Sequence, residues 1–105
     1  MNPGRISITQ KKGIHMLFPS GFTVSIQFGP GNYCDHYKRR IGKDEETCGE
    51  EGAAEVECAI WKDEGMITMK DGDTVQGYMS ITEVLELLNQ AAKGEFNEQF
   101  QIRGI

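Results

Sequence analysis

Apolar residues occupy every second position between residues 22 and 28, and polar residues fill the positions between them. A period of two predicts a β-strand with one buried face. Residues 14–18 predict a second strand, and the intervening Pro19, Ser20 and Gly21 favour a tight turn through the fixed φ of proline and the freedom of glycine. These segments therefore predict a β-hairpin, and residues 6–9 predict a short strand before it.

A second alternating pattern begins at residue 54, with Val56, Cys58 and Ile60 on one face and Glu55 and Glu57 on the other. Two further strands are predicted over residues 66–70 and 74–79, and Gly- and Asp-containing turns separate the three segments. Together they predict an antiparallel meander. A glycine at position 77, inside the last strand, predicts a bulge or a close backbone approach.

One helix is predicted after the strands. Ser80 and Glu83 have the spacing of a capping box, and Gly94 favours the helix end. The apolar residues at helical spacing, which are expected to face the sheet, are Ile81, Val84, Leu85, Leu88, Ala91 and Ala92. Phe96, Phe100 and Ile102 are expected to dock as a final strand. The predicted fold class is α+β, an antiparallel β-meander sheet with one amphipathic helix packed on it, in a single domain over residues 1–105.

Composition narrows the class of protein. The chain has 105 residues, of which 38% are hydrophobic and 26% charged, values that are typical of a folded globular protein. No apolar run approaches the length of a membrane span, and the first twelve residues have no apolar core of a signal peptide. Three irregularly spaced cysteines fit a reducing compartment better than a disulfide framework. We therefore expect a cytoplasmic protein with no membrane contact.

A long polar loop is predicted at about residues 29–53, and its first half combines three features of an anion site. The glycines allow close backbone approach to a phosphate, the aromatic side chains can stack on a base, and the basic side chains can hold a phosphate. The alternative is a tight turn followed by a solvated loop. The candidate ligand-binding residues are Asn32, Tyr33, His36, Tyr37, Lys38, Arg39 and Arg40.

An acidic block follows this basic one. Residues 44–57 hold seven of the sixteen acidic residues, in a chain whose net charge is −5. Such a block can imitate a nucleic-acid backbone and occupy a basic groove on a partner, or it can simply be a solvated loop. Trp61 lies on the outward face of its predicted strand and is a candidate interface hot spot, unless both faces of the sheet are covered. The candidate partner-binding residues are Glu45, Glu46, Glu50, Glu51 and Trp61.

Metal binding and catalysis are poorly supported. His15, Cys34, His36, Cys48 and Cys58 include metal-ligand types, but their spacing matches no zinc pattern. Cys34 and His36 lack a third group that would orient a nucleophile and its base. We therefore expect no catalytic residue, no metal and no cofactor. A general basic surface for duplex DNA is also absent from the sequence.

The stretch 13–35, with its hairpin leading into Gly29-Pro30-Gly31-Asn32-Tyr33, resembles small bacteriophage-encoded proteins without a settled activity. The resemblance implies a phage gene that acts inside a bacterial cell, where proteins of this size without enzyme motifs are often counter-defence factors. It transfers no catalytic residue.

Three functions follow as expectations. The first is immune evasion by sequestering a nucleotide immune signal, as phage sponge proteins do, and the loop 29–40 favours it. The second is direct inhibition of a defence nuclease, as anti-CRISPR proteins do, and the acidic block favours it. The third is a phage accessory protein with no immune role. For the first, we also expect a homo-oligomer in which the neighbouring chain helps to hold the loop, because ordering a loop on binding costs free energy.

Overall fold

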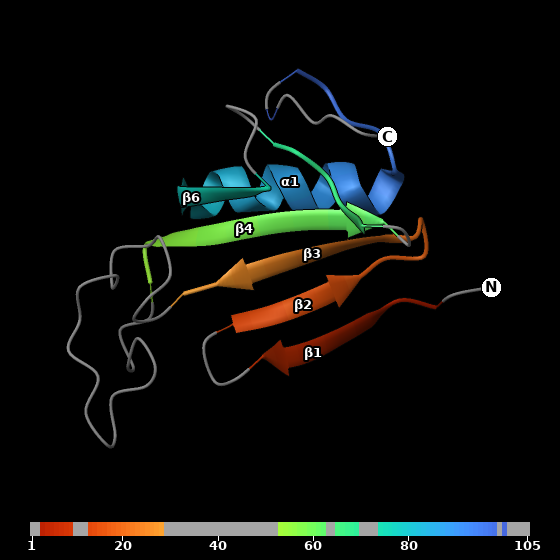
Figure 1. The fold of residues 1–105 in the computed structure, drawn as a ribbon, viewed down its shortest axis with the longest axis horizontal. Coiled ribbons are helices and arrows are strands. Elements are labelled where there is room, and N and C mark those ends of the chain that lie inside the picture. Colours follow the sequence, from red (N-terminus) through yellow and green to blue (C-terminus); the bar gives the residue numbers. More distant parts are fainter. Residues whose placement is uncertain are drawn as a thin grey trace.

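The computed structural model describes residues 3–9, 13–28, 53–62, 65–69, 74–98 and 100. They form six strands and one helix (Figure 1). The strands are β1 (Arg5–Thr9), β2 (Gly13–Leu17), β3 (Phe22–Gln27), β4 (Glu55–Lys62), β5 (Gly65–Met66) and β6 (Val75–Ser80), and the helix is α1 (Ile81–Lys93).

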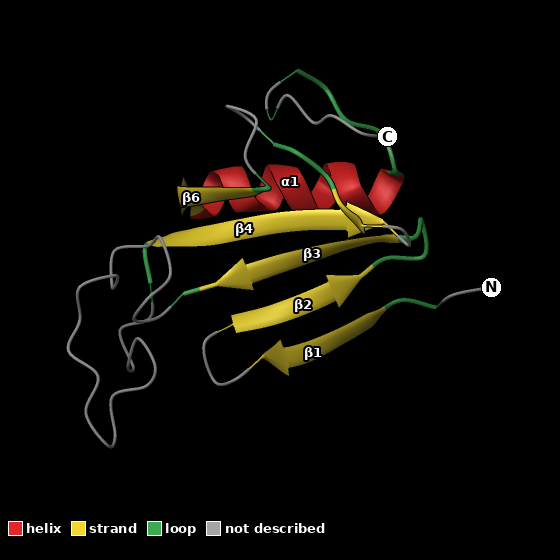
Figure 2. Cartoon of the chain, viewed as in Figure 1, coloured by secondary structure: helices red, strands yellow, loops and turns green. Residues whose placement is uncertain are grey.

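The strands form one antiparallel sheet in the order β1-β2-β3-β4-β5. β6 also pairs with β4, so β5 and β6 lie one after the other along the same edge of β4. The helix packs against β3, β4 and β6, on one face of the sheet (Figure 2). The predicted α+β meander with one packed helix is confirmed.

The turn between β2 and β3 forms as predicted and also anchors the helix. Gly21 has a φ of +97°, a value that favours glycine, and its N–H donates to the carbonyl of Phe18 at 2.9 Å. The Ser20 hydroxyl donates to the carbonyl of Ala91, near the end of α1, at 2.7 Å. The hairpin and the helix are therefore held together at this end of the sheet.

The core lies between the sheet and the helix. The apolar face predicted for β3 is confirmed, because Phe22, Val24 and Ile26 are all buried. The same holds for β4, where Cys58 packs as a small apolar residue. The buried hydrophobic residues are Phe22, Val24, Ile26, Val56, Cys58, Ala59, Ile60, Ile67, Met69, Met79, Val84, Leu87, Ala91 and Phe100.

The buried face of α1 is rotated relative to the prediction. Val84, Leu87 and Ala91 are buried, whereas Ile81 and Leu85 are each 56% exposed. The apolar residues of α1 span a wider part of the helix surface than the part that contacts the sheet. Because α1 covers β3, β4 and β6, the flank of the helix that carries Ile81 and Leu85 extends beyond the buried contact.

Two strand predictions in the second half differ from the structure. The predicted strand over residues 66–70 is reduced to β5, after which Ile67 and Met69 turn into the core and are 3% and 1% exposed. The final strand predicted around Phe96 and Phe100 is wrong for the described residues, which form turns and irregular structure there. Phe100 is buried all the same, and the Phe96 ring packs edge-on against Phe22. These two aromatic side chains are therefore positioned by packing against the core and not by strand pairing.

The bulge expected at Gly77 is present. Gly77 and Tyr78 of β6 together face Glu57 of β4, so the register shifts by one residue at this point. Tyr78 has a φ of +52°, which is uncommon for a bulky residue and marks local backbone strain.

The capping box at the start of α1 is confirmed in full. The Ser80 hydroxyl accepts a hydrogen bond from the N–H of Glu83 at 3.2 Å, and the Glu83 carboxylate accepts one from the N–H of Ser80 at 3.1 Å. Both bonds satisfy backbone donors that have no partner inside the helix.

Replacing Ser80 with alanine is expected to lower the free energy of unfolding by about 1 kcal/mol, because the side-chain cap is lost. Urea unfolding followed by circular dichroism measures this loss. Ser80→Asp is the matched control, since aspartate is an equally good cap and should retain most of the stability. Equal stability of Ser80→Ala and wild type would show that the cap does not contribute.

Candidate functional site

The structure places only part of the predicted site. Trp61 is described, on β4. The predicted ligand-binding residues Asn32, Tyr33, His36, Tyr37, Lys38, Arg39 and Arg40 lie outside the described residues, as do Glu45, Glu46, Glu50 and Glu51. The described part of the candidate site therefore consists of residues of the sheet.

One face of the sheet carries the core and α1, and no described element packs on the opposite face, here called the open face. Directly paired residues on neighbouring strands share a face, so the strand register gives three rows across it. The first row consists of Arg5, Leu17, Thr23 and Trp61, and the second of Ser7, His15, Ser25 and Ala59. The third row contains Gly13, Gln27 and Glu57.

An aromatic pair formed by residues of two rows lies on the open face. The rings of His15 and Trp61 are 5.0 Å apart between centroids, with an angle of 82° between their planes. His15 lies on β2 and Trp61 on β4, and these strands are about 10 Å apart with β3 between them. Both side chains therefore lean across β3 to meet. Edge-to-face pairs are worth about 0.5–1.5 kcal/mol beyond their buried area, so this contact holds the indole in a defined orientation.

Small residues lie next to this aromatic pair. Ser25 and Ala59 are each only 6% exposed, although they belong to the open face. Both lie in the row of His15, so the leaning rings account for their burial. The Ser25 hydroxyl accepts a hydrogen bond from the Gln27 side-chain amide at 3.0 Å. The edge-to-face rings therefore stand next to small side chains, and this part of the open face is here called the aromatic platform.

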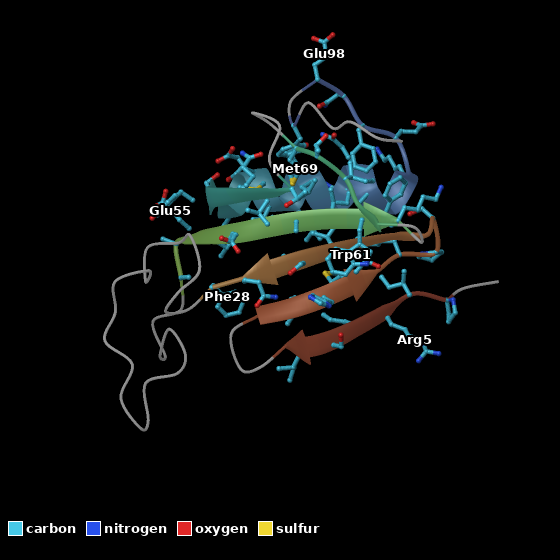
Figure 3. All side chains as sticks on the ribbon, in the orientation of Figure 1. Arg5, Phe28, Glu55, Trp61, Met69 and Glu98 are labelled. Carbon is cyan, nitrogen blue, oxygen red and sulfur yellow. The ribbon has the colours of Figure 1, made fainter. Side chains whose placement is uncertain are left out.

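Charge is divided between the two ends of the open face. Arg5 and Trp61 lie in the same row, at the end where β4 finishes, and Glu55 lies at the other end of β4 (Figure 3). Glu55 and Glu57 alternate with the buried Val56 and Cys58, so both belong to the open face. Glu57 is four residues from Trp61, about 13 Å along the strand. The last two residues of the acidic block therefore share a face with the candidate hot spot.

The described residues bring together none of the metal ligands considered from the sequence. His15 lies on the open face and Cys58 in the core, on opposite sides of the sheet. Within the described ranges, no group of three His, Cys, Asp or Glu side chains is arranged to hold a metal ion.

Cys58 is a free, buried thiol. Its burial, and to a lesser extent the negative charges of Glu57 and Glu83, raise the pKa of the Cys58 thiol from 9.0 to about 12. A protonated thiol is a poor nucleophile. At neutral pH, Cys58 therefore acts as a packing residue.

Sequence reasoning missed the role of His15 on this face, because it treated His15 only as a metal ligand. The available signal was the pairing of the predicted hairpin, which places His15 beside Ser25 and thus on the same face as Trp61. That inference needs the exact register of three strands, which depends on the turn conformation.

The helical structure in the described ranges lacks the length and apolar character that crossing a membrane requires. Comparison with known proteins adds no identification: no protein-family model, no curated protein sequence and no solved structure gives a significant match to this chain.

Proposed function

We propose that this chain is a non-enzymatic binding protein that inhibits a nucleic-acid-handling protein of a bacterial defence system by docking its open face on that protein's basic surface. The observation that carries the proposal is that Trp61 and the acidic Glu55 and Glu57 lie on one face of the sheet, over which no described element packs. The phage setting comes from the sequence resemblance.

The aromatic platform supplies the affinity in this proposal. Tryptophan is among the residues most enriched in interface hot spots, where truncation costs 2 kcal/mol or more. His15 already holds the Trp61 ring at 5.0 Å, so little side-chain freedom is lost on docking. A preorganised tryptophan on an uncovered sheet face favours a protein surface as target.

In this proposal, the acidic end of the open face, with Glu55 and Glu57, determines which kind of partner is bound. Proteins that handle nucleic acids neutralise phosphates with lysine and arginine, and these basic surfaces attract carboxylates. Glu55 and Glu57 continue the acidic run that begins at residue 44 in the sequence. Charge complementarity of this kind raises association rates and disfavours wrong partners.

Sequestration of a nucleotide immune signal is the second candidate function. The Trp61–His15 pair favours it, since aromatic rings stack on bases with about 1–3 kcal/mol per base, and Arg5 lies in the same row as Trp61. The carboxylates of Glu55 and Glu57 weigh against it, because they repel phosphates. The direct-inhibitor function is therefore the better supported of the two.

Binding to purified RNA-guided effector nucleases, measured by biolayer interferometry, tests the proposal. Replacing both Glu55 and Glu57 with glutamine should slow association by about tenfold at low salt, with a smaller effect at high salt where charges are screened. Duplex DNA should compete with the chain for the nuclease.

Calorimetry with cyclic dinucleotides, cyclic trinucleotides and cyclic ADP-ribose isomers is the other arm of this test. Tight binding of one of these ligands, with no binding to any nuclease, would contradict direct inhibition and support the second candidate. Nuclease binding that is unaffected by the double substitution would refute the role of the acidic end.

A further inference from the structure

The edge strand β1 carries two exposed apolar side chains. Ile6 is 66% exposed and Ile8 is 80% exposed. Through the register with β2 and β3, both lie on the same face as the buried Val24 and Ile26. The helix covers β3, β4 and β6, so these two isoleucines lie beyond the part of that face that it packs against.

Apart from the charge of Arg5 at its first residue, β1 has none of the features that commonly protect the outer edge of a sheet against strand pairing. Natural edge strands are commonly blocked by lysine, proline, an inward-pointing charge or a bulge. β1 has the sequence RISIT and pairs regularly with β2 over its full length. Among the described strands, β2 is its one neighbour. Such an edge is a template for another strand.

The sequence of β1 is complementary to itself in one antiparallel register. With Ser7 opposite Ser7, each Ile6 lies opposite Ile8 of the second strand, and each Arg5 lies opposite Thr9. No like charges face each other in this register, although the chain as a whole carries a net charge of −5. The absence of carboxylates from β1 makes this edge suited to self-association.

We propose that a second copy of this chain pairs with β1 of the first, antiparallel about a two-fold axis at Ser7. The two sheets then form one continuous sheet, and the four isoleucines pack side by side on its helix-bearing face. The axis is perpendicular to the sheet, so both open faces point the same way. A dimer would therefore present two Trp61 platforms to one partner assembly, which raises avidity.

The small contact area sets the strength of the dimer. A five-residue strand pair with two isoleucines from each copy is at the low end of interface sizes, where complexes are weak. We therefore expect a dissociation constant in the micromolar range and a monomer–dimer equilibrium that depends on concentration.

Sedimentation equilibrium of the full chain tests the interface. Ile8→Lys should raise the dimer dissociation constant by at least about tenfold, because a lysine on an edge strand blocks pairing. The matched control is Leu85→Lys, which introduces the same charge at a 56% exposed apolar residue on α1 and should leave dimerisation unchanged. Circular dichroism should show that both variants are folded.

Disulfide trapping tests the register in a background with Cys34 and Cys48 replaced by serine. Ser7→Cys should form a linked dimer on mild oxidation, because directly opposed residues have Cα atoms about 4.5–5.5 Å apart, within disulfide range. Arg5→Cys should not, since the two copies of residue 5 would be about 13 Å apart.

A wild-type chain that stays monomeric at high micromolar concentration would overturn the proposal. A dimer that Ile8→Lys and Leu85→Lys leave equally intact would overturn it as well, because the interface would then lie elsewhere. Equal cross-linking of Ser7→Cys and Arg5→Cys would exclude the proposed register.

Discussion

Replacing Trp61 with alanine is expected to weaken binding of the partner protein by about a hundredfold, while the domain stays folded. Truncating a hot-spot tryptophan costs about 2–4 kcal/mol, and about 2.8 kcal/mol corresponds to a factor of one hundred. The fold should survive because Trp61 lies on the open face, across the sheet from the core. Biolayer interferometry against the nuclease measures the loss.

The matched control for this substitution is Leu85→Ala, which removes a large apolar side chain that is 56% exposed on the helix. It should change affinity by less than twofold, because it lies on the helix-bearing side of the sheet. A Trp61→Ala variant that binds as tightly as wild type would show that the open face is not the recognition surface. Equal losses in both variants would point to a general loss of structure.

Replacing Val24 with aspartate is expected to unfold the chain. Val24 is 0% exposed at the centre of the core, between β2 and β4. A buried carboxylate without a partner costs several kcal/mol, which is most of the stability of a small domain. Thermal melting followed by circular dichroism should show no cooperative transition.

Leu85→Asp is the informative comparison, because the sequence alone predicts that it would also unfold the chain. With Leu85 56% exposed, the new carboxylate remains in water, and the expected cost is about 1 kcal/mol or less from helix propensity. Cooperative melting of Leu85→Asp with an unfolded Val24→Asp would confirm the observed helix face. If Leu85→Asp unfolded instead, the assignment of the helix face would be wrong.

Strands with strict alternation were predictable from the sequence. Phe22, Val24 and Ile26 have one possible inward face, and a slip by one residue would expose all of them. The helix start was equally predictable, because Ser80 and Glu83 make local hydrogen bonds that need no tertiary information. Local chemistry determined these elements.

Elements that depend on tertiary packing were harder to predict. The apolar residues of α1 cover a wide stripe, and the width of sheet available beneath the helix decides which of them are buried. Ile67 and Met69 lie beyond the regular strand β5, although the Ile67 N–H still donates to the carbonyl of Ile60, and both side chains fill the core. Phe100 is buried without belonging to a strand for the same reason.

The candidate site was predictable in part. Alternation along β4 identified Trp61 as outward-facing, but its contact with His15 requires the register of three strands. The loop residues from Asn32 to Arg40 remain a sequence prediction, since they lie outside the described residues.

The most direct test of the central claim uses the single tryptophan of the chain. Incorporating 5-fluorotryptophan gives one fluorine resonance, from Trp61 alone, even when the partner contains many tryptophans. Titration with the unlabelled nuclease should shift or broaden this resonance in step with binding, because the indole becomes buried in the interface. A resonance that stays unchanged at saturation, while binding is confirmed independently, would contradict the claim that the open face is the recognition surface.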